Sequence, residues 1–406
     1  MPKHCVIIGA SHAAAQLVAS LRQLGWNGGI TLIGDEPHVP YHHPPLSKDY
    51  LSDAKTADEL FIRPEASYGA ADVTLKLGAR VTKIDRAGKT ITTDTDEVIA
   101  YDKLVLATGA RVRKLPIDGA QLQGVFYLRD MADVTAIKAA LKTSTRAVII
   151  GGGYIGLETA GSLRKLGLEV KVLEAMPRIL QRVTAPQLSE FYKRIHSEEG
   201  VDIFEDTIAD KITKDDAGLV VTDKAGYHYG ADFVIIGIGV IPNMELAKAA
   251  GLACGNGIVV NEFCQTSDDD IYAAGDVSWH YNIKYDRHLR LESVPNAIDQ
   301  AKVVAGHMCN KAKAYDSLPW FWSDQYDLKL QIAGLSEGYD DLIIRGNREG
   351  SRSFAAFYFK GNKFLAVDAV NAPREFAMSR MVLSQGKSLD KQKLANESFA
   401  LKDTII

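Results

Sequence analysis

Apolar and polar positions follow the same order in two stretches of the chain, about 140 residues apart, starting at His4 and at Ala147. Each stretch has a short run of β-branched residues, a turn of small residues, a segment with helical periodicity and a second β-branched run. This order is typical of a β-α-β unit. Two such units in one chain predict two domains with parallel sheets, each of a kind that binds a nucleotide.

The rest of the chain alternates between strand-like and helical patterns. Residues 73–102 indicate strands and a turn, and residues 103–110 indicate a buried strand that ends in a tight turn. A helical pattern runs from residue 294 to about 310, and from about residue 318 the positions alternate as in an antiparallel sheet before closing helices. We therefore expect an α/β fold with two Rossmann-like dinucleotide-binding domains plus a C-terminal α+β domain.

The composition is that of a soluble globular protein. The 406 residues include 46% apolar and 24% charged side chains, and the net charge of −4 indicates neither a nucleic-acid nor a membrane partner. No apolar run approaches the roughly 20 residues of a membrane helix, and the first strand begins too close to Met1 for a signal peptide. The four cysteines lie far apart without a metal-binding pattern. We expect a cytoplasmic protein without a metal site.

The first small-residue turn matches the dinucleotide-binding pattern G-x-G-x-x-G/A with one departure. Gly9 permits the sharp exit from the strand, and Ala14 lets the helix approach the sheet. Ser11 stands where a glycine usually lets the backbone approach the pyrophosphate, but it is small and can donate a hydrogen bond. The helix presents its N-terminus to the phosphates. Asp35 is the candidate for the adenosine ribose, with Glu36 as the alternative.

The second turn matches the pattern fully, with Gly151, Gly153 and Gly156. Glu174 follows 18 residues after Gly156, at the end of the next strand, where a carboxylate accepts from both ribose hydroxyls. An NADP 2′-phosphate would meet this like charge at a cost of about 4 kcal/mol at an effective dielectric of 20. The second turn therefore favours NADH, although Arg178 is near enough in sequence to meet a 2′-phosphate.

Three further motifs resemble those of the two-dinucleotide-binding flavoproteins similar to glutathione reductase. They are ATG at Ala107, Thr108 and Gly109, GIGVIPN at residues 237–243 and AAGD at residues 273–276. The resemblance implies that the first β-α-β unit binds FAD, that the second binds the nicotinamide cofactor, and that Asp276 holds the ribityl chain. The expected domains are an FAD-binding domain in two segments, 1–113 and 245–316, an NAD-binding domain over 114–244 and a C-terminal α+β domain over 317–406.

The electron acceptor distinguishes the branches of that family. Disulfide reductases carry a cysteine pair near the end of the first domain, and peroxidases and oxidases carry one cysteine there. This chain instead has VPYHHPPLSKDYL over residues 39–51, and no cysteine between Cys5 and Cys254. PPLSK, together with GGGYIGLE, ESVPNA, PWFWSDQY and GLSEGYD, resembles the oxygenase-coupled NADH:ferredoxin reductases, the putidaredoxin reductase family. The likeness covers nearly the whole chain, while His43 stands where many relatives have arginine.

This resemblance implies roles for individual residues. Lys48, paired with Glu158, would lie beside flavin N5 and stabilise the charge of the reduced ring, and Tyr154 would shield the flavin until the nicotinamide displaces it. Val294 opens a helix whose N-terminal dipole can face the pyrimidine edge of the flavin. The candidate contacts with FAD and NADH are Gly9, Ser11, Ala13, Ala14, Asp35, Glu36, Lys48, Val81, Ala107, Thr108, Gly109, Arg129, Gly151, Gly153, Tyr154, Ile155, Gly156, Glu174, Gly239, Gly275, Asp276, Val294 and Trp320.

Two tryptophans stand close together in the PWFWSDQY motif. We expect Trp320 and Trp322 to alternate on a strand and face opposite sides, one near the isoalloxazine and the other toward solvent or the partner. The alternative is that both are core aromatics of the C-terminal domain.

The implied function is hydride transfer from NADH to FAD, followed by single electrons to a small [2Fe–2S] ferredoxin that serves an oxygenase. The chain is expected to be a monomer or a weak homodimer. One alternative is an NADH oxidase-like flavoprotein without a protein partner, and another is an NADH-sensing interaction protein resembling apoptosis-inducing factor, which shares PPLSK. The net charge of −4 weighs against the latter. Because such ferredoxins are acidic, the candidate docking cations are Lys284, Arg287, Arg290, Lys302 and Lys329.

Overall fold

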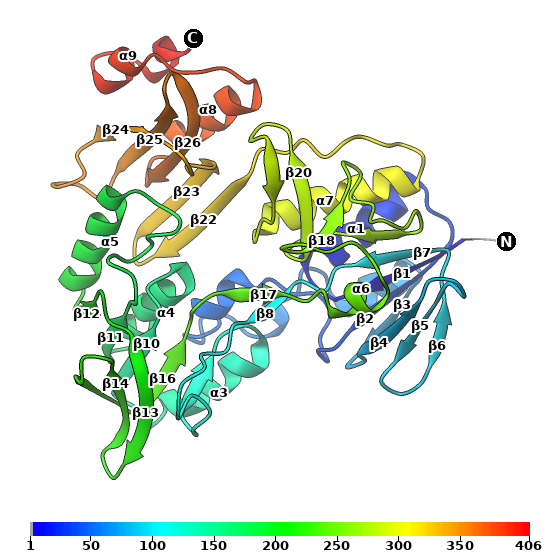
Figure 1. The fold of residues 1–406 in the computed structure, drawn as a ribbon, viewed down its shortest axis with the longest axis horizontal. Helices are drawn as coiled ribbons and strands as arrows, with labels where there is room; N and C mark the ends of the chain where they lie inside the picture. The colour runs from blue at the N-terminus through cyan, green and yellow to red at the C-terminus, as the bar shows by residue number, and fades with distance from the viewer. Residues whose placement is uncertain (1–2) are drawn as a thin grey trace. The chain divides into compact units, whose positions relative to one another are not determined.

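A computed structural model describes residues 3–406, and the contacts within it divide the chain into two units (Figure 1). The first unit comprises the chain up to His42, Ala57–Arg111 and Val240–Pro319. The second comprises His43–Thr56, Val112–Gly239 and Trp320–Ile406. The sequence places residues 43–56 in the first FAD-binding segment, whereas their contacts place them in the second unit. The three-domain division itself stays a prediction.

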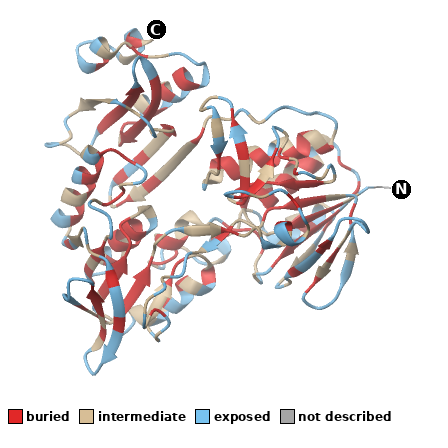
Figure 2. Ribbon diagram, in the orientation of Figure 1, coloured by how far each residue is buried: buried red, intermediate tan, exposed pale blue. Residues whose placement is uncertain are grey.

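A five-stranded parallel sheet forms the centre of the first unit, in the order β19-β7-β1-β2-β3. Alternate side chains of β1 serve its two faces: Cys5 and Ile7 pack with α1 and α7, and Val6 and Ile8 pack with β4 and β5. Both faces are therefore covered, and the strands are buried (Figure 2). The elements are β1 His4–Ile8, α1 His12–Leu24, β2 Gly29–Gly34, α2 Glu65–Ala70, β3 Val73–Leu77, β4 Val81–Asp85, β5 Thr90–Thr93, β6 Val98–Ala100, β7 Lys103–Leu106, α6 Glu245–Ala249, β18 Ile258–Val260, β19 Ile271–Ala273, β20 Ser278–Asn282, β21 Arg287–Leu289 and α7 Val294–Met308.

The second unit contains a parallel sheet of the same kind, in the order β12-β11-β10-β16-β9. As in the first unit, a three-stranded antiparallel sheet, here β13-β14-β15, packs on one face. Helices α4 and α5 pack on strands β10, β11 and β12. The elements are the 3-10 turn η1 Pro44–Ser47, β9 Val125–Tyr127, α3 Met131–Leu141, β10 Arg146–Ile150, α4 Tyr154–Lys165, β11 Glu169–Leu173, α5 Pro186–Glu198, β12 Val201–Phe204, β13 Ala209–Asp215, β14 Gly218–Asp223, β15 His228–Ala231 and β16 Phe233–Ile236. A two-stranded sheet pairs β17 Val240–Pro242, which belongs to the first unit, with β8 Ala110–Val112, whose first two residues also belong to it.

The C-terminal part of the second unit is a five-stranded antiparallel sheet in the order β22-β23-β26-β25-β24. Helix α8 packs on β23 and β26, and α4 packs on β22. Together with the two parallel sheets, this confirms the expected fold class. The elements are β22 Trp320–Gln325, β23 Leu328–Gly334, β24 Asp341–Gly346, β25 Phe354–Lys360, β26 Lys363–Val370, α8 Pro373–Ser384 and α9 Lys391–Ala395, with the 3-10 turn η3 at Leu401–Thr404. The 3-10 turn η2, Asp58–Leu60, belongs to the first unit.

The expectation that Trp320 and Trp322 face opposite sides is wrong. Side chains two positions apart on a strand point the same way, and the two rings lie 5.6 Å apart on one face of β22. Trp320 also packs against Phe376 of α8, and the guanidinium of Arg380 lies 4.9 Å from its ring. The other face of β22 carries the intervening residues, beginning with Phe321.

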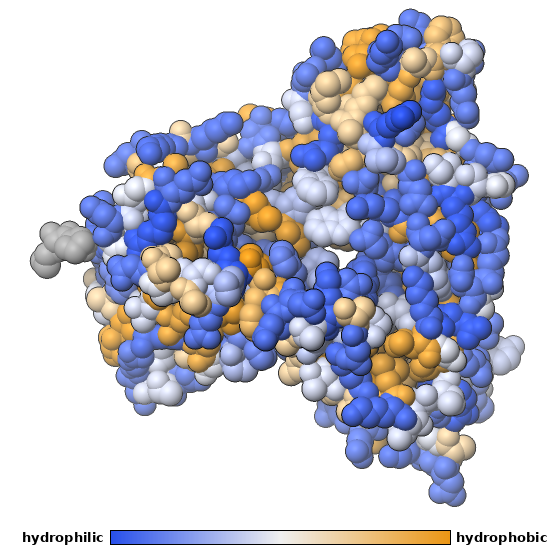
Figure 3. Space-filling view, turned by 180° about the vertical axis from the view of Figure 1, so that it is seen from behind, coloured by the Kyte–Doolittle hydropathy of each residue, from blue (hydrophilic) through white to orange (hydrophobic). Residues whose placement is uncertain are grey.

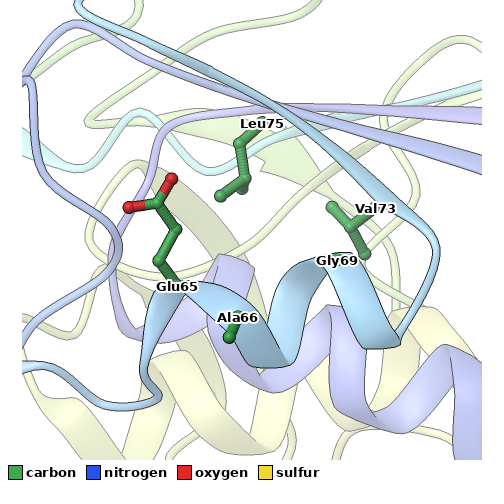
Figure 4. Close-up of a pocket in the computed structure, with 5 residues that line it drawn as sticks. All are labelled: Glu65, Ala66, Gly69, Val73 and Leu75. Carbon is green, nitrogen blue, oxygen red and sulfur yellow. The ribbon is translucent and has the colours of Figure 1, made fainter.

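Polar side chains cover most of the face seen in Figure 3, with smaller apolar areas between them. Among residues 3–406, no helix is long and apolar enough to cross a membrane. The surface pocket in Figure 4 lies on α2 and β3 and is lined by Glu65, Ala66, Gly69, Val73 and Leu75. It contains none of the residues that the sequence singles out.

Candidate functional site

The first small-residue turn connects β1 to α1. Gly9 has a φ of 107°, and a Cβ atom there would lie 2.1 Å from the backbone oxygen of Ala107, so only glycine fits. Ser11 is the N-cap of α1 and makes no side-chain capping hydrogen bond, and the helix begins with its N-terminus at this turn. Ala13 and Ala14 are buried in the first turn of α1. This arrangement is suited to a pyrophosphate.

The ATG and AAGD motifs come together at this turn within the first unit. Ala107 lies against Gly9, and the hydroxyl of Thr108 donates to the backbone oxygen of Asn243 at 2.7 Å. The Asn243 amide donates back to the Thr108 oxygen at 2.9 Å. Gly275 has a φ of 82°, and a Cβ atom there would lie 3.7 Å from that of Ala13. The structure thus brings these sequence-predicted residues together.

The two candidate ribose acids differ in how they are engaged. Asp35 follows β2, and its side chain is 61% exposed with an ion pair to Arg80 at 3.3 Å. The Glu36 carboxylate accepts a hydrogen bond from the hydroxyl of Tyr41 at 2.7 Å. Asp35 is therefore the better placed of the two for a ribose.

Gln300 of α7 is a residue that the sequence did not single out. Its side chain is fully buried, and its Oε1 accepts from the Gly275 amide and from the Ser278 hydroxyl, both at 2.8 Å. Gln300 therefore fixes the loop that carries Asp276. A single glutamine within a helical pattern gives no sequence signal from which this contact could be predicted.

The second turn connects β10 to α4. Gly151 has a φ of 116°, and a Cβ atom there would lie 2.3 Å from the backbone oxygen of Gly237. A Cβ atom at Gly156 would lie 2.0 Å from the backbone oxygen of Gly151. Gly153 is the N-cap of α4, with open space where its Cβ would stand. The N-terminus of α4 is thus accessible to a phosphate group.

Glu174 is held by the backbone of its own loop. Its Oε2 accepts from the Gly152 amide at 2.7 Å, and its Oε1 accepts from the Met176 amide at 2.8 Å. Each carboxylate oxygen has a further lone pair for a ribose hydroxyl. The carboxylate therefore has a fixed orientation at the glycine turn.

Arg178 is tied to the protein. Its Nη1 donates to the Ser189 hydroxyl at 2.6 Å, and its Nη2 donates to the backbone oxygen of Gln181 at 3.1 Å. Ser189 is buried and donates in turn to the oxygen of Ile179. These contacts occupy the guanidinium that the sequence offered for a 2′-phosphate.

Lys48 and Glu158 form an ion pair within the second unit, as the sequence resemblance implies. The side chain of Glu158 is 8% exposed and that of Lys48 is 20% exposed. The Lys48 ammonium also donates to the Pro44 oxygen at 3.0 Å, and the Ser47 hydroxyl donates to Glu158 at 2.8 Å. The hydroxyl of Ser323, on β22, donates to the second carboxylate oxygen at 2.7 Å. Ser47 and Ser323 were not singled out from the sequence.

Tyr154 begins α4 and packs on Phe321, with ring centroids 5.0 Å apart. Burial raises the pKa of the Tyr154 phenol well above its usual value, so the hydroxyl stays protonated. The next residue, Ile155, is 44% exposed. The first turn of α4 thus combines an anchored aromatic ring with an accessible apolar side chain.

The remaining candidates are distributed over both units. Val81 is in the core beside β1, and Val294 begins α7, both in the first unit. Arg129, Gly239 and Trp320 belong to the second unit, as does Lys48. Their contacts with a cofactor stay predictions.

Burial makes the cysteines poor nucleophiles. It raises the pKa of Cys5 to about 12 and raises those of Cys254, Cys264 and Cys309 above the usual value. A thiolate at any of them is disfavoured at neutral pH. None of the four cysteines therefore has the lowered pKa of a catalytic thiol.

Residues 3–301 match the family described as pyridine nucleotide-disulphide oxidoreductase, and residues 320–405 match the family described as reductase C-terminal. The chain belongs to the pyridine nucleotide-disulphide oxidoreductases and is an FAD-dependent oxidoreductase that uses a nicotinamide cofactor. The two glycine turns are suited to two dinucleotides, FAD and the nicotinamide cofactor. At each turn the chain leaves a strand sharply at a glycine and begins a helix, whose N-terminus can bind a pyrophosphate.

Within that family the chain is similar to ferredoxin reductases. It is 43% identical to putidaredoxin reductase of Pseudomonas putida, over 98% of this chain and 96% of the relative. It is 39% identical to the ferredoxin–NAD(+) reductase component of the anthranilate 1,2-dioxygenase system of Burkholderia cepacia, over 98% of each chain. The crystal structure of the covalent putidaredoxin reductase–putidaredoxin complex matches with a TM-score of 0.96 and 42% identity, covering 99% of this chain and 98% of that chain.

Proposed function

We propose that this chain is the cytoplasmic, NADH-dependent ferredoxin reductase of an oxygenase system. The observation that carries the proposal is the ion pair of Lys48 with the buried Glu158, since Lys48 lies in the segment where disulfide reductases carry cysteines. The similarity to reductases that serve putidaredoxin and a dioxygenase system supports a small [2Fe–2S] ferredoxin as the acceptor.

In the first unit, the residues around Gly9 would hold FAD. The α1 N-terminus binds the pyrophosphate, Asp35 accepts from the adenosine ribose, and Gln300 holds the loop from which Asp276 reaches the ribityl chain. Bound there, FAD would supply the chemistry of accepting a hydride from NADH and passing its two electrons on singly. No protein nucleophile is required for that chemistry.

In the second unit, Glu174 and the α4 N-terminus would hold NADH. The fixed Glu174 carboxylate accepts from the ribose hydroxyls and repels a 2′-phosphate, and the engaged Arg178 offers that phosphate no compensating charge. The preference for NADH follows from the charge of Glu174, which the engaged Arg178 does not offset.

Lys48 would place a positive charge at the flavin. Glu158, Ser47 and the Pro44 oxygen hold its ammonium in one position, so that little reorganisation is needed when negative charge develops on the ring. The Tyr154 ring lies at the start of α4, where the nicotinamide would displace it.

The docking cations proposed from the sequence are not equally available. The Arg290 side chain is 12% exposed and paired with Glu292, and that of Lys284 is 24% exposed and paired with Asp316. Lys302 is 55% exposed and has a 3.3 Å pair with Asp299. Of these three cations, Lys302 is the most exposed and therefore the most available to a ferredoxin.

Substitution of Lys48 tests the proposal. Lys48→Ala should keep FAD and slow flavin reduction by NADH about 10²-fold, the effect of losing one preorganised donor. Lys55→Ala is the control, because Lys55 lies in the same segment in a 3.2 Å surface pair with Asp49. Stopped-flow absorbance of the flavin gives the rate. An unchanged rate in Lys48→Ala would contradict the role assigned to Lys48.

A further inference from the structure

A line of buried polar side chains runs through the second unit from Glu158 to Tyr326. Ser323 Oγ lies 2.7 Å from Glu158 Oε1, and Gln325 Nε2 lies 3.2 Å from Ser323 Oγ. His196 Nε2 lies 2.9 Å from Gln325 Oε1, and the Tyr326 hydroxyl lies 3.2 Å from His196 Nδ1. The exposed fractions of Ser323, Gln325 and His196 are 1%, 2% and 0%, so water does not compete for these groups.

The chemistry of the groups allows one direction along this line. A carboxylate only accepts, so Ser323 donates to Glu158, and the Ser323 oxygen then accepts from the amide of Gln325. Gln325 Oε1 accepts from His196 Nε2–H, which leaves Nδ1 as the acceptor for Tyr326. Burial lowers the pKa of His196 to about 4, in keeping with this neutral ring. Every hydrogen bond therefore points toward Glu158.

The donors fix both oxygens of the Glu158 carboxylate. Oε1 receives Ser323 of β22, and Oε2 receives Ser47 and Lys48 of the η1 segment. Aligned hydrogen bonds polarise one another in a buried environment, which strengthens the bond at the charged end. Rotation of the carboxylate would break bonds on both sides, so Ser323 restrains the oxygen that binds Lys48.

The sequence pattern separates this line from the two tryptophans. On β22 the residues Phe321, Ser323 and Gln325 alternate with Trp320 and Trp322 and so point to the opposite face of the sheet. One face of strand β22 thus packs against α8, and its other face contacts Glu158 through Ser323.

We propose that Ser323, oriented by Gln325 and His196, is a positioning residue for the Glu158–Lys48 pair. Through it the C-terminal domain sets the place of the ammonium that acts in flavin reduction. The inference rests on the proposed function for the action of Lys48 on the flavin, whereas the aligned hydrogen bonds do not depend on it.

Removal of the Ser323 hydroxyl tests the kinetic part. Ser323→Ala should slow flavin reduction by NADH about tenfold, with an unchanged Kd for NADH, because a hydrogen bond to a charged group is lost. A tenfold loss in the equilibrium stabilisation of the reduced flavin would in turn lower its two-electron midpoint potential by about 30 mV. Ser323→Thr should restore both quantities.

A second buried serine of the same domain supplies the control. Ser379 on α8 is fully buried, and among the described residues its hydroxyl has no hydrogen-bond partner. Ser379→Ala should leave the rate and potential unchanged. Should Ser323→Ala fail to fold, Ser323→Cys retains the size with a weaker donor and should show the same change in part. Wild-type rate and potential in the folded Ser323 variants would overturn the proposal.

The tautomer of His196 tests the direction of the line without any turnover. In ¹⁵N NMR of histidine-labelled holoenzyme at pH 7, with His196→Gln for assignment, Nε2 should carry the proton and Nδ1 should not. A charged ring or the opposite tautomer would overturn the alignment.

The two substitutions separate the two proposals. If Lys48→Ala leaves flavin reduction unchanged, the proposed role of Lys48 fails. If only Ser323→Ala has no effect, the positioning role of Ser323 alone fails.

Discussion

The two β-α-β turns share the glycine that leaves the strand but differ in the first helical turn. At Gly9 and Gly151 an added Cβ atom would lie 2.1 Å and 2.3 Å from a backbone oxygen of the adjacent turn. Ala14, by contrast, carries a Cβ atom that is fully buried, whereas one at Gly156 would lie 2.0 Å from the Gly151 oxygen. The second turn is the tighter of the two.

The acidic residues that follow the two turns, Asp35 and Glu174, also differ in how tightly the protein holds them. Asp35 is mostly exposed and paired with Arg80, whereas the Glu174 carboxylate is held by two backbone amides of its own loop. On the proposed function, FAD would stay bound while NADH would bind and leave in each turnover. A preorganised acid reduces the ordering cost of each binding event, and the carboxylate of Glu174 is the more restrained of the two.

The largest effect is expected from alanine at the two strand-exit glycines. Gly9→Ala should prevent FAD incorporation, and Gly151→Ala should retain the flavin spectrum but lose about 10³-fold in kcat/KM for NADH. Backbone strain and close contact together cost about 4–5 kcal/mol. Flavin absorbance after purification and steady-state kinetics provide the two readouts. Equal loss of FAD in both variants would remove the assignment of one cofactor to each turn.

Acid should weaken the first unit before the second. Burial lowers the pKa of His280 in the first unit and of His196 in the second to about 4. Each unfolded histidine gains a proton below about pH 6.5, so stability falls between about pH 6.5 and 4, by about 3 kcal/mol per histidine. Burial raises the pKa of Asp368, in the second unit, to about 6, so folded Asp368 binds a proton first and stability rises as pH falls over that range.

Hydrogen exchange followed by mass spectrometry at pH 7 and pH 4.5 measures this difference unit by unit. Peptides around His280 should lose protection, while those around His196 and Asp368 should keep most of theirs. His280→Gln removes the titrating group and should reduce the loss in the first unit. Uniform loss over both units would contradict the compensation by Asp368.

The preference for NADH should depend on Glu174 and very little on Arg178. We expect the chain to prefer NADH over NADPH by at least about tenfold, roughly 1.4 kcal/mol. Glu174→Gln should narrow this ratio of kcat/KM values by removing the like charge. Arg178→Ala should leave the ratio unchanged, because Ser189 and the Gln181 oxygen already hold the guanidinium. Equal use of both cofactors by the unaltered chain would refute the assignment.

The smallest effect is expected at Ala14. Ala14→Gly makes the first turn resemble the second and should cost about 1 kcal/mol, the helix-propensity difference, without loss of FAD. Thermal unfolding of the holoenzyme measures this change in stability.

The reciprocal substitution Gly156→Ala has no space for the added Cβ atom and should reduce NADH binding strongly. A harmless Gly156→Ala would show that the second turn is less tight than its geometry indicates.

The sequence predicted the parts of the fold that have strong local signals. Both glycine turns, the helix that begins at Val294 and the antiparallel C-terminal sheet follow from periodicity and small residues, and the structure confirms them. The prediction that Trp320 and Trp322 face opposite sides was wrong, because side chains two positions apart on a strand point to the same side. Ser323 was missed because its partner Glu158 is 165 residues away in sequence, a separation at which local pattern carries no signal.

Electron transfer from NADH to a ferredoxin is the central claim, and its stoichiometry is the most direct test. Putidaredoxin serves as the probe, with [2Fe–2S] reduction and NADH consumption followed together in air. The account predicts that nearly two ferredoxins are reduced for each NADH consumed, before and after thiol alkylation, and that the ferredoxin KM rises with salt. NADH consumption that reduces O₂ while the ferredoxin stays oxidised would contradict it and favour an NADH oxidase.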